Sequence, residues 1–381
     1  MNQINNTVMK ALKITGIIIG ALILIALGLS GFVAYKANNE FNPDLNTKDL
    51  ELRIDKTFDK AIEKGHSSGI AIALYKNDTL LIKTYGLKDK QSGEEIDTNT
   101  IFEIGSITKV FTTSILQMSA DAGHLKLEDD IRQYLPDSIK YGFEHTISLE
   151  QLATHTSGLP RLPTRWFDDS LVVNECNPYT HLNFDSIVTY LENPTEMGTQ
   201  GEVAYSNLGS GLIGHILERI HNKSLNELLD SMIFNPLNMS HSGIETDSSL
   251  KHLVANGYDK NGNAACNWQL PILASCGAIE SNIPDMLQFL KANLNEDHEL
   301  YSSFSKCHEK RLSNLMGNQG LGWQVGLDII SNFIFFNHSK NFRWHNGGTG
   351  GFRSAIVLDK KSNNGIIVLS SGENDISTDA I

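Results

Sequence analysis

Strand-like segments occur near both ends of this chain, whereas its long middle has the pattern of helices and loops. Near the N-terminus, Ile70–Tyr75 and Leu80–Tyr85 are rich in apolar, β-branched and aromatic residues, and the turn-forming segment Lys76–Thr79 joins them, which predicts a hairpin. Five further strand-like segments lie near the C-terminus: Gly322–Leu327, Phe333–Asn337, Asn341–Trp344, Ser354–Leu358 and Ile366–Ser370. This arrangement predicts an α/β protein of the α+β sandwich type, in which one antiparallel sheet is built from both chain ends and flanked by helices.

The mainly helical middle, about residues 125–315, is expected to form a second lobe inserted between the two halves of the sheet. Helices are predicted at Lys48–Lys64, at Ser106–Ala122 and at Gly209–His221, and Gly123 follows the second of them as a helix stop. A cleft between two lobes is a usual place for a ligand. We therefore expect the functional site where the sheet meets the inserted lobe.

An uncharged apolar segment near the N-terminus, Ile14–Tyr35, comprises 22 consecutive residues, which is long enough to cross a bilayer as a helix. It is long for a secretory signal, although Gly28–Ser30 offers a weak cleavage site. We expect residues 1–36 to be a membrane anchor or, alternatively, a cleaved signal, residues 37–50 a polar linker, and residues 51–381 the folded domain. A long domain behind a first span is usually translocated, so this domain is expected outside the cytoplasm, anchored or secreted.

The formal net charge of −13 argues against nucleic-acid binding, which needs a clustered basic surface. The histidines and cysteines lack the spacing of a metal site, so neither a metal nor another cofactor is expected. Outside the cytoplasm the four cysteines are able to pair, and Cys266 with Cys276 is the closest couple in sequence; alternatively, Cys176, Cys266, Cys276 and Cys307 are all small buried apolar residues. The sequence does not indicate the oligomeric state.

A serine and a lysine three residues apart are the first candidates for chemistry. Ser106 and Lys109 lie at the start of a predicted helix, directly after Gly105, and residues three apart share a helix face. A Ser-x-x-Lys pair is one way in which acyl-transfer enzymes make a serine nucleophilic. The same spacing occurs at Ser248–Lys251 and Ser303–Lys306, so the pair alone is weak evidence.

Two further motifs follow Ser106 in the chain and distinguish it from the other matches. Tyr205-x-Asn207 directly precedes the predicted helix Gly209–His221, and the glycine-rich stretch His345–Gly351 lies between two C-terminal strands. Taken singly, each has a simpler explanation: Tyr205 as an interfacial aromatic, Asn207 as a helix cap, and the glycines as a loop. Their order along the chain favours a catalytic set.

Five segments occur in a characteristic order: Phe102–Lys109, Leu152–Pro160, Tyr205–Gly209, Asn235–Met239 and the glycine-rich stretch that begins at His345. Jointly they resemble the class C β-lactamase, DD-peptidase and esterase family of serine hydrolases, also called penicillin-recognising enzymes. The resemblance covers about residues 65–375. Members of that family usually end in a helix packed on the sheet, and residues 375–381 are short for one, so we expect either an abbreviated helix or a fragment.

The resemblance implies a role for each matching residue. Ser106 would be the nucleophile, and the cation of Lys109 would lower the cost of deprotonating Ser106 or Tyr205. Tyr205 would act first as general base and later as general acid. Asn207 would hydrogen-bond Lys109 and the substrate amide. The backbone N–H groups of Ser106 and Gly348 would form the oxyanion hole.

The third motif departs from the Lys-Thr-Gly of class C β-lactamases, because His345 and Asn346 stand where that family has lysine and threonine. A histidine is only partly charged at neutral pH, so the permanent cation that attracts a β-lactam carboxylate is missing. DD-peptidase-like and esterase-like relatives often carry histidine here, so we keep His345 in the catalytic set and expect Asn346, Gly347 and Thr349 to contact the substrate. Arg353 is either a second cation that binds a carboxylate or a solvated surface residue.

The sequence therefore predicts a membrane-anchored serine hydrolase that forms an acyl-enzyme on an amide or ester: a wall peptide ending in D-alanine, a β-lactam or a small ester. The alternative is a membrane-anchored sensor that binds penicillin or peptide without efficient turnover. The expected partners are a small-molecule or peptide substrate and the membrane, through residues 14–35.

Overall fold

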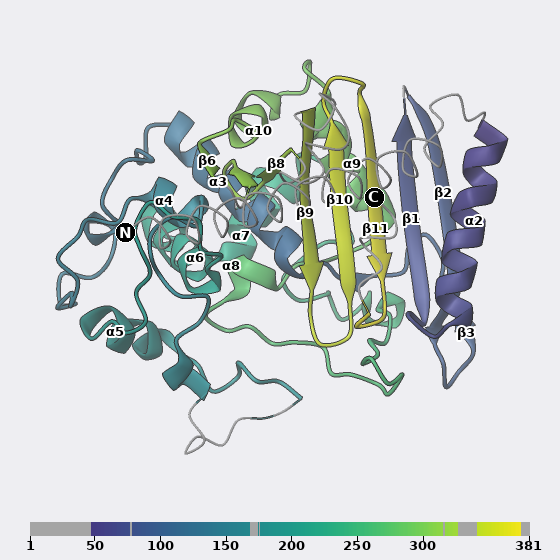
Figure 1. Ribbon diagram of the computed structural model, residues 1–381, viewed down its shortest axis with the longest axis horizontal. Coiled ribbons are helices and arrows are strands. Elements are labelled where there is room, and N and C mark those ends of the chain that lie inside the picture. The colour runs from purple at the N-terminus through teal and green to yellow at the C-terminus, as the bar shows by residue number, and fades with distance from the viewer. Residues whose placement is uncertain are drawn as a thin grey trace, which may run out of the picture.

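The strand-rich ends of the chain form one sheet in the computed structural model, which describes residues 47–76, 78–167, 174, 176–314, 317–326 and 341–374 (Figure 1). Its strands are β1 (Gly69–Lys76), β2 (Thr79–Asp89), β3 (Glu94–Glu95), β6 (Leu312–Asn314), β7 (Gly317–Gln319), β8 (Gln324–Val325), β9 (Phe342–Gly348), β10 (Arg353–Asp359) and β11 (Asn364–Ser370). They follow the order β3-β2-β1-β11-β10-β9-β8-β7-β6, and every neighbouring pair is antiparallel. The pairing of β1 with β11, with Ile70 opposite Ser370, closes the sheet from both chain ends as predicted.

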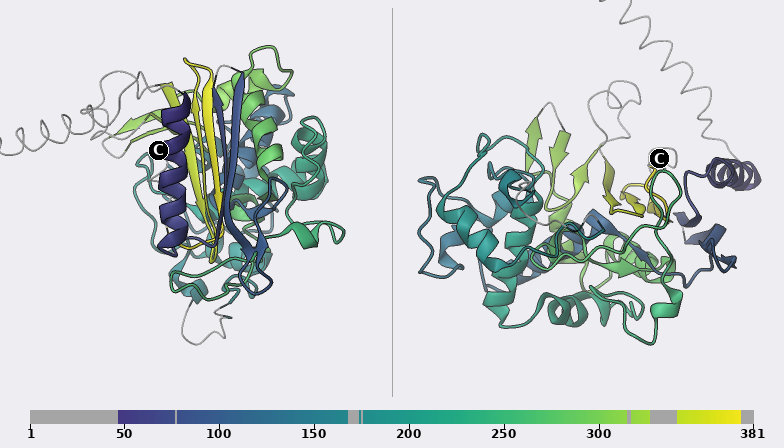
Figure 2. Two further views of the ribbon diagram at one scale, coloured as in Figure 1. Left: turned by 90° about the vertical axis from the view of Figure 1, so that its right-hand side faces the viewer. Right: turned by 90° about the horizontal axis from the view of Figure 1, so that it is seen from below.

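Helices cover both faces of this sheet. The first, α2 (Thr47–Glu63), lies on one face, and α9 (Ile283–Leu294) packs on β11, β1 and β10 from the other (Figure 2). Side chains that alternate along β1 point to opposite faces: Ile70 and Ile72 join the small cluster under α2, whereas Ala71 joins the main core. The sheet is therefore buried on both sides in this region.

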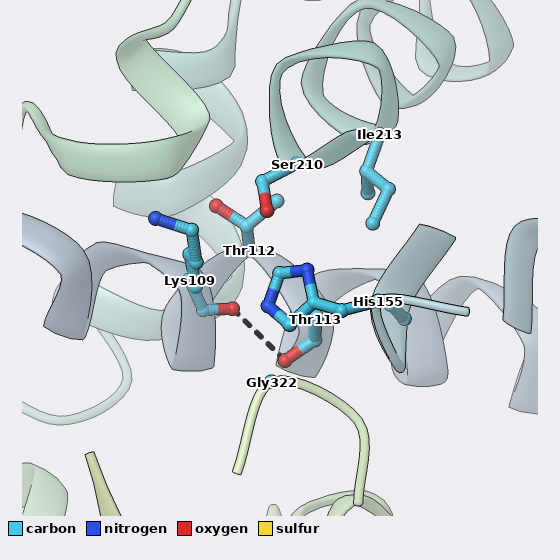
Figure 3. A pocket seen from close by; sticks show the side chains of 8 residues that line it. Lys109, Thr112, Thr113, His155, Ser210, Ile213 and Gly322 are labelled. Atoms are coloured by element: carbon cyan, nitrogen blue, oxygen red, sulfur yellow. Dashed lines mark hydrogen bonds between the residues drawn. The ribbon is translucent and has the colours of Figure 1, made fainter. Parts of the chain in front are cut away.

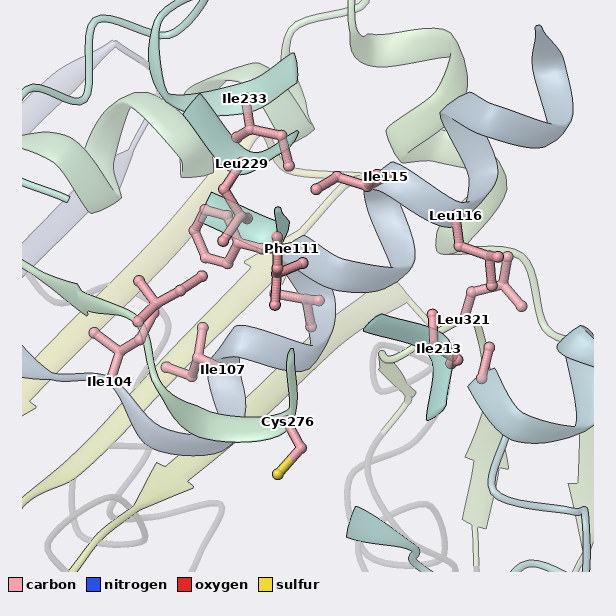
Figure 4. Packing of buried hydrophobic residues seen from close by; sticks show 14 of the residues in the cluster. Ile104, Ile107, Phe111, Ile115, Leu116, Ile213, Leu229, Ile233, Cys276 and Leu321 are labelled. Carbon is pink, nitrogen blue, oxygen red and sulfur yellow. The ribbon is translucent and has the colours of Figure 1, made fainter. Parts of the chain in front are cut away.

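Between β3 and β6 the chain forms most of its helices: α3 (Thr108–Asp121), α4 (Leu149–Ala153), α5 (Phe184–Glu192), α6 (Asn207–His221), α7 (Leu225–Leu229), α8 (Ala274–Gly277), α9 and α10 (Tyr301–Cys307). A short pair of strands, β4 (Phe102–Glu103) and β5 (Glu280–Ser281), lies within this region. Figure 4 shows how α3 runs through the core, where Phe111 stacks on Phe289 with ring centroids 3.9 Å apart. Because α3 is buried on nearly all sides, the residues at its N-terminus are held rigidly.

The predicted helices and strands are largely confirmed, with local differences. The N-cap of α6 is Ser206, whose Oγ accepts the N–H of Gly209, so Asn207 is the first residue of the helix and not its cap. The predicted strand Gly322–Leu327 is reduced to β8, and its last residue lies outside the described residues, as does Phe333–Asn337. The hairpin β6–β7 was not predicted, because its segments lack a strong apolar alternation.

The cysteine pairing differs from the closest couple in sequence. Cys176 and Cys266 form a disulfide with a Cα–Cα distance of 5.4 Å, whereas Cys276 and Cys307 are free and buried. The pairing of Cys266 with Cys276 was therefore wrong: Cys276 belongs to α8, which packs against α3 in the core. The expected membrane span, residues 14–35, lies outside the described residues, and among those that are described no helix has both the length and the apolar character to span a bilayer.

Candidate active site

Ser106 lies in a single tight turn, Gly105–Ile107, that leads into α3. Gly105 has φ +50°, and a Cβ added to it would lie 2.6 Å from the amide nitrogen of Gly348 in β9. A Cβ on Gly347 would lie 2.0 Å from the carbonyl oxygen of Ile104. The glycines of both segments thus allow strand β9 to pass directly beside the turn that carries the serine.

Lys109 lies one turn further along, beneath the serine, and is only 1% exposed. Its Nζ donates to Ser106 Oγ at 3.1 Å and to the carbonyl oxygen of Cys276 at 2.7 Å. Figure 3 shows its side chain beside Thr112, with His155 across a narrow gap that has no room for a water molecule. Because Lys109 is almost completely buried, bulk water is excluded from its side chain, which strengthens its electrostatic effect on the serine.

Tyr205 lies between several basic side chains. Its ring centroid is 4.8 Å from Lys109 Nζ and 5.1 Å from the guanidinium carbon of Arg161. The rings of His155 and His345 lie 4.5 Å and 6.3 Å from it, centroid to centroid. Its hydroxyl has no hydrogen-bond partner among the described residues, so the phenol is available to a ligand.

The two histidines beside Tyr205 are both buried and uncharged at neutral pH. Burial, with a smaller contribution from Lys109, lowers the pKa of His345 from 6.5 to about 3. Burial likewise holds the pKa of His155 well below its ordinary value. The ring of His155 accepts the backbone N–H of Ser206 at Nδ1, 3.2 Å away, so this histidine fixes the segment that carries the tyrosine.

These residues surround a cleft of ≈ 500 Å³. It is lined by Ser106, Arg161, Tyr205, Trp268, Asn346, Gly347, Gly348, Thr349, Gly350, Arg353 and Glu373. The cleft therefore contains all of the predicted site residues except Lys109, Asn207 and His345. Along β9 the side chain of His345 is buried and that of Asn346 is exposed, as expected for successive residues of a strand.

The remaining predicted residues have mixed outcomes. Nη1 of Arg353 donates to the carbonyl oxygens of Thr349 and Phe352, both at 2.8 Å, so part of its guanidinium holds its own loop. The expected hydrogen bond from Lys109 to Asn207 does not occur among the described residues; the carbonyl of Cys276 takes that place. Instead, Oδ1 of Asn207 is buried without a hydrogen-bond partner within the described part of the chain.

Sequence reasoning missed three side chains that line the cleft, those of Arg161, Trp268 and Glu373. Arg161 directly follows the segment Leu152–Pro160, and this adjacency was the only sequence signal for it. Trp268 lies against Gly350, where an added Cβ would be 2.6 Å from the indole nitrogen. Its backbone N–H donates to the carboxyl of Glu103 at 2.9 Å, and burial raises the pKa of that carboxyl to about 7.

The two other Ser-x-x-Lys matches have structural explanations. Ser303 and Lys306 both donate to the carboxylate of Asp121, each at 2.6 Å, and Ser248 and Lys251 are exposed. Within the described residues, no group of three or more histidine, cysteine or acidic side chains is placed to hold a metal ion. Ser106 is thus the serine whose lysine lies beneath a cleft.

The fold and the Ser–Lys pair together define a class of proteins, the serine hydrolases of the β-lactamase type. A sequence profile of the family named Beta-lactamase matches residues 54–380, and the chain belongs to this family. The protein flp of Staphylococcus aureus (strain N315) is 28% identical over 336 residues, which cover 85% of this chain but 64% of flp. A β-lactamase of Pseudomonas fluorescens is 27% identical over 288 residues, covering 73% of this chain and 75% of the relative.

Solved structures establish the fold as that of class C β-lactamases. A D-alanine carboxypeptidase from Burkholderia cenocepacia superposes with a TM-score of 0.75 at 21% identity, covering 88% of this chain and 97% of that one. A class C β-lactamase from Rhodobacter sphaeroides superposes with a TM-score of 0.72 at 20% identity, covering 85% and 95%. At these identities the likeness concerns the fold alone.

Proposed function

We propose that this chain hydrolyses an amide or ester through an acyl-enzyme formed on Ser106. The observation that carries this proposal is the 3.1 Å hydrogen bond from the buried Nζ of Lys109 to Ser106 Oγ, at the edge of the ≈ 500 Å³ cleft. A buried cation beside a serine favours the alkoxide over the neutral hydroxyl. Membership in the β-lactamase family supports the same chemistry.

The reaction would proceed in two halves. Ser106 Oγ forms a bond to the substrate carbonyl carbon while its proton passes to Tyr205, which would act as the general base and whose ring centroid lies 4.8 Å from Lys109 Nζ. The phenol then returns this proton to the leaving nitrogen or oxygen as the scissile bond breaks. Water attacks the resulting ester by the same sequence and regenerates the serine, with the acid as product.

The backbone N–H groups of Ser106 and Gly348 would stabilise the oxyanion in both halves. The close passage of Gly348 beside Gly105 supports this assignment. Asn207 would hydrogen-bond the substrate amide, and its Oδ1 has no hydrogen-bond partner among the described residues. His345 would act through its neutral ring, which packs near Tyr205, rather than as a cation.

The proposed substrate is a wall peptide ending in D-alanine, a small ester or a β-lactam. The names of the relatives, a β-lactamase and a D-alanine carboxypeptidase, support this range. The uncharged His345 argues for slow hydrolysis of β-lactams, because at this position of β9 a β-lactam carboxylate would meet a neutral ring and not a cation.

Labelling with a fluorescent penicillin tests the nucleophile, in parallel with hydrolysis assays on aryl esters and on peptides ending in D-Ala-D-Ala. Ser106→Ala should abolish labelling and lower ester or peptide hydrolysis by about 10³-fold or more. Ser303→Ala, a serine of a second Ser-x-x-Lys match, is the matched control and should behave as wild type. Labelling that depends on Ser106 without any turnover would favour a sensor. The absence of both labelling and turnover would refute the proposal.

We also propose that residues 14–35 anchor the domain to a membrane, with the cleft outside the cytoplasm. The support is the uncharged apolar length of this segment. Full-length protein should require detergent for extraction, and a variant lacking residues 1–36 should be released by salt alone. Release of the full-length protein by salt would contradict the anchor, and loss of the segment from the mature protein would indicate a cleaved signal.

A further inference from the structure

Arg161 lies where a substrate anion would need a cation. It lines the same cleft as Ser106, and its guanidinium carbon lies 5.1 Å from the ring centroid of Tyr205. The protein carries a formal net charge of −13, so an anionic substrate is repelled over most of the molecule. A local cation in the cleft is therefore the means by which such a substrate would be captured.

The other basic groups of the site are uncharged or at least partly engaged. Both hydrogen bonds of Lys109 are directed to Ser106 and to the backbone. Nη1 of Arg353 is shared between two carbonyl oxygens of its own loop. His345 is neutral because it is buried. The guanidinium of Arg161, in contrast, is exposed and makes neither a hydrogen bond nor an ion pair with any described residue.

The backbone of Arg161 is fixed to the segment that carries Tyr205. Its carbonyl oxygen accepts the N–H groups of Asn207 and Leu208, at 3.0 Å and 3.2 Å. The hydroxyl of Ser206 donates to the carbonyl of Pro160, the preceding residue, at 2.7 Å. The backbone of Arg161 is therefore held in a fixed position relative to Tyr205, from which its side chain projects.

We infer that Arg161 determines specificity by binding a carboxylate of the substrate. This inference rests on the proposed function, since the bound molecule is the one that Ser106 would acylate. Arginine presents paired N–H donors that match the two oxygens of a carboxylate. Glu373, also in the cleft, would repel an anion from its own part of the lining, which leaves the part formed by Arg161 and Tyr205 as the preferred position.

Matched aryl esters test this inference in the active enzyme. In one pair the leaving group carries either a carboxylate or a carboxamide, and in a second pair the acyl group does. In one of the two pairs, Arg161→Gln should lower kcat/KM for the carboxylate ester by about 10- to 100-fold, mainly through KM. In the same pair, kcat/KM for the carboxamide ester should not change. Arg161→Lys should recover part of the loss, and Arg219→Gln, an exposed arginine at the end of α6, should match wild type.

Two outcomes would overturn the inference. An equal loss for carboxylate and carboxamide esters, expressed in kcat, would mean that Arg161 acts on Tyr205 and not on the substrate. No change for any ester would mean that Arg161 is only a surface residue.

A binding measurement separates this inference from the proposed chemistry. In a Ser106→Ala background, titration calorimetry with the same esters measures affinity without acylation. A preference for the carboxylate ester that disappears with Arg161→Gln supports the inference even if wild type shows no turnover. Equal affinity for both esters with Arg161 intact refutes it, whatever the role of Ser106.

Discussion

Replacing Glu103 with glutamine should remove a pH-dependent loss of stability that this buried carboxyl imposes on the fold. Glu103 ends the short strand β4 and is 5% exposed. Burial raises its pKa from 4.5 to about 7, although the N–H of Trp268 and the hydroxyl of Thr349 favour the ionised form. Glutamine has nearly the same shape and keeps an acceptor for the Trp268 N–H, so the substitution changes mainly the charge.

The sign and size of the effect follow from the two pKa values. Below pH 4.5 the carboxyl is protonated in both the folded and the unfolded chain, and wild type gains its full stability. As pH rises towards 7, the unfolded chain loses the proton first, so the free energy of unfolding falls. At 1.36 kcal/mol for each pKa unit, wild type should lose about 3 kcal/mol relative to the glutamine variant, and the difference should level off above pH 7.

Urea denaturation followed by near-ultraviolet circular dichroism, at steps between pH 4.5 and 8, measures this difference directly. The curve of wild type minus Glu103→Gln should fall by about 3 kcal/mol across that interval. Glu144→Gln, which removes an exposed carboxylate, is the control and should run parallel to wild type. Parallel curves for Glu103→Gln and wild type would show that the carboxyl ionises normally in the folded protein and would refute the reasoning.

Two further substitutions test other parts of the structure. Gly105→Ala should abolish acylation and lower the unfolding free energy by about 1–3 kcal/mol, because φ is +50° and the new Cβ would lie 2.6 Å from the amide nitrogen of Gly348. Acylation kinetics and urea denaturation measure the two effects. Acylation at the wild-type rate would contradict the prediction. Cys176→Ser should lower the free energy of unfolding by about 4 kcal/mol under oxidising conditions and leave it unchanged in excess reductant, because the disulfide to Cys266 closes a loop of 90 residues. Urea denaturation under both conditions tests this prediction. An equal loss under both conditions would exclude the chain-entropy explanation.

The sequence was sufficient for the elements of the fold whose signals are local. The short runs of apolar and β-branched residues in Ile70–Tyr75 and Ile366–Ser370 predicted two neighbouring strands of the sheet, which pair along their whole length. The glycine stop after α3 has φ +77°, as a left-handed helix terminus requires. Such features depend on a few consecutive residues, so they form largely independently of distant segments of the chain. The disulfide failed as a prediction, because proximity in sequence does not determine which cysteines meet in space.

The composition of the cleft depends on contacts between distant segments, so only part of it was predictable from the sequence. Ser106, Tyr205 and the glycines of β9 were found through their order along the chain, and the structure brings them to one cleft. Arg161 was missed because a lone arginine after a proline has no pattern of its own. Its position beside Tyr205 depends on the hydrogen bonds that join its carbonyl oxygen to the start of α6, which no local sequence pattern predicts. The partner of Lys109 was likewise a backbone carbonyl, which no side-chain motif encodes.

The burial of His345 connects the unusual third motif with the specificity proposed for Arg161. Close approach of the β9 glycines to the turn before α3 leaves His345 only 3% exposed, so a charge there would be desolvated and repelled by Lys109. A charged histidine is therefore unavailable at pH 7, and the β9 residues that line the cleft, Asn346–Gly348, offer a substrate hydrogen-bonding groups without a cation. Of the two arginines that line the cleft, Arg353 is partly engaged with its own loop, so Arg161, which adjoins Tyr205, is the cation more available to an anion. A substrate held there has its anionic group beside the proposed proton-transfer residue, so binding through Arg161 would align the scissile bond with Tyr205 and Ser106 together.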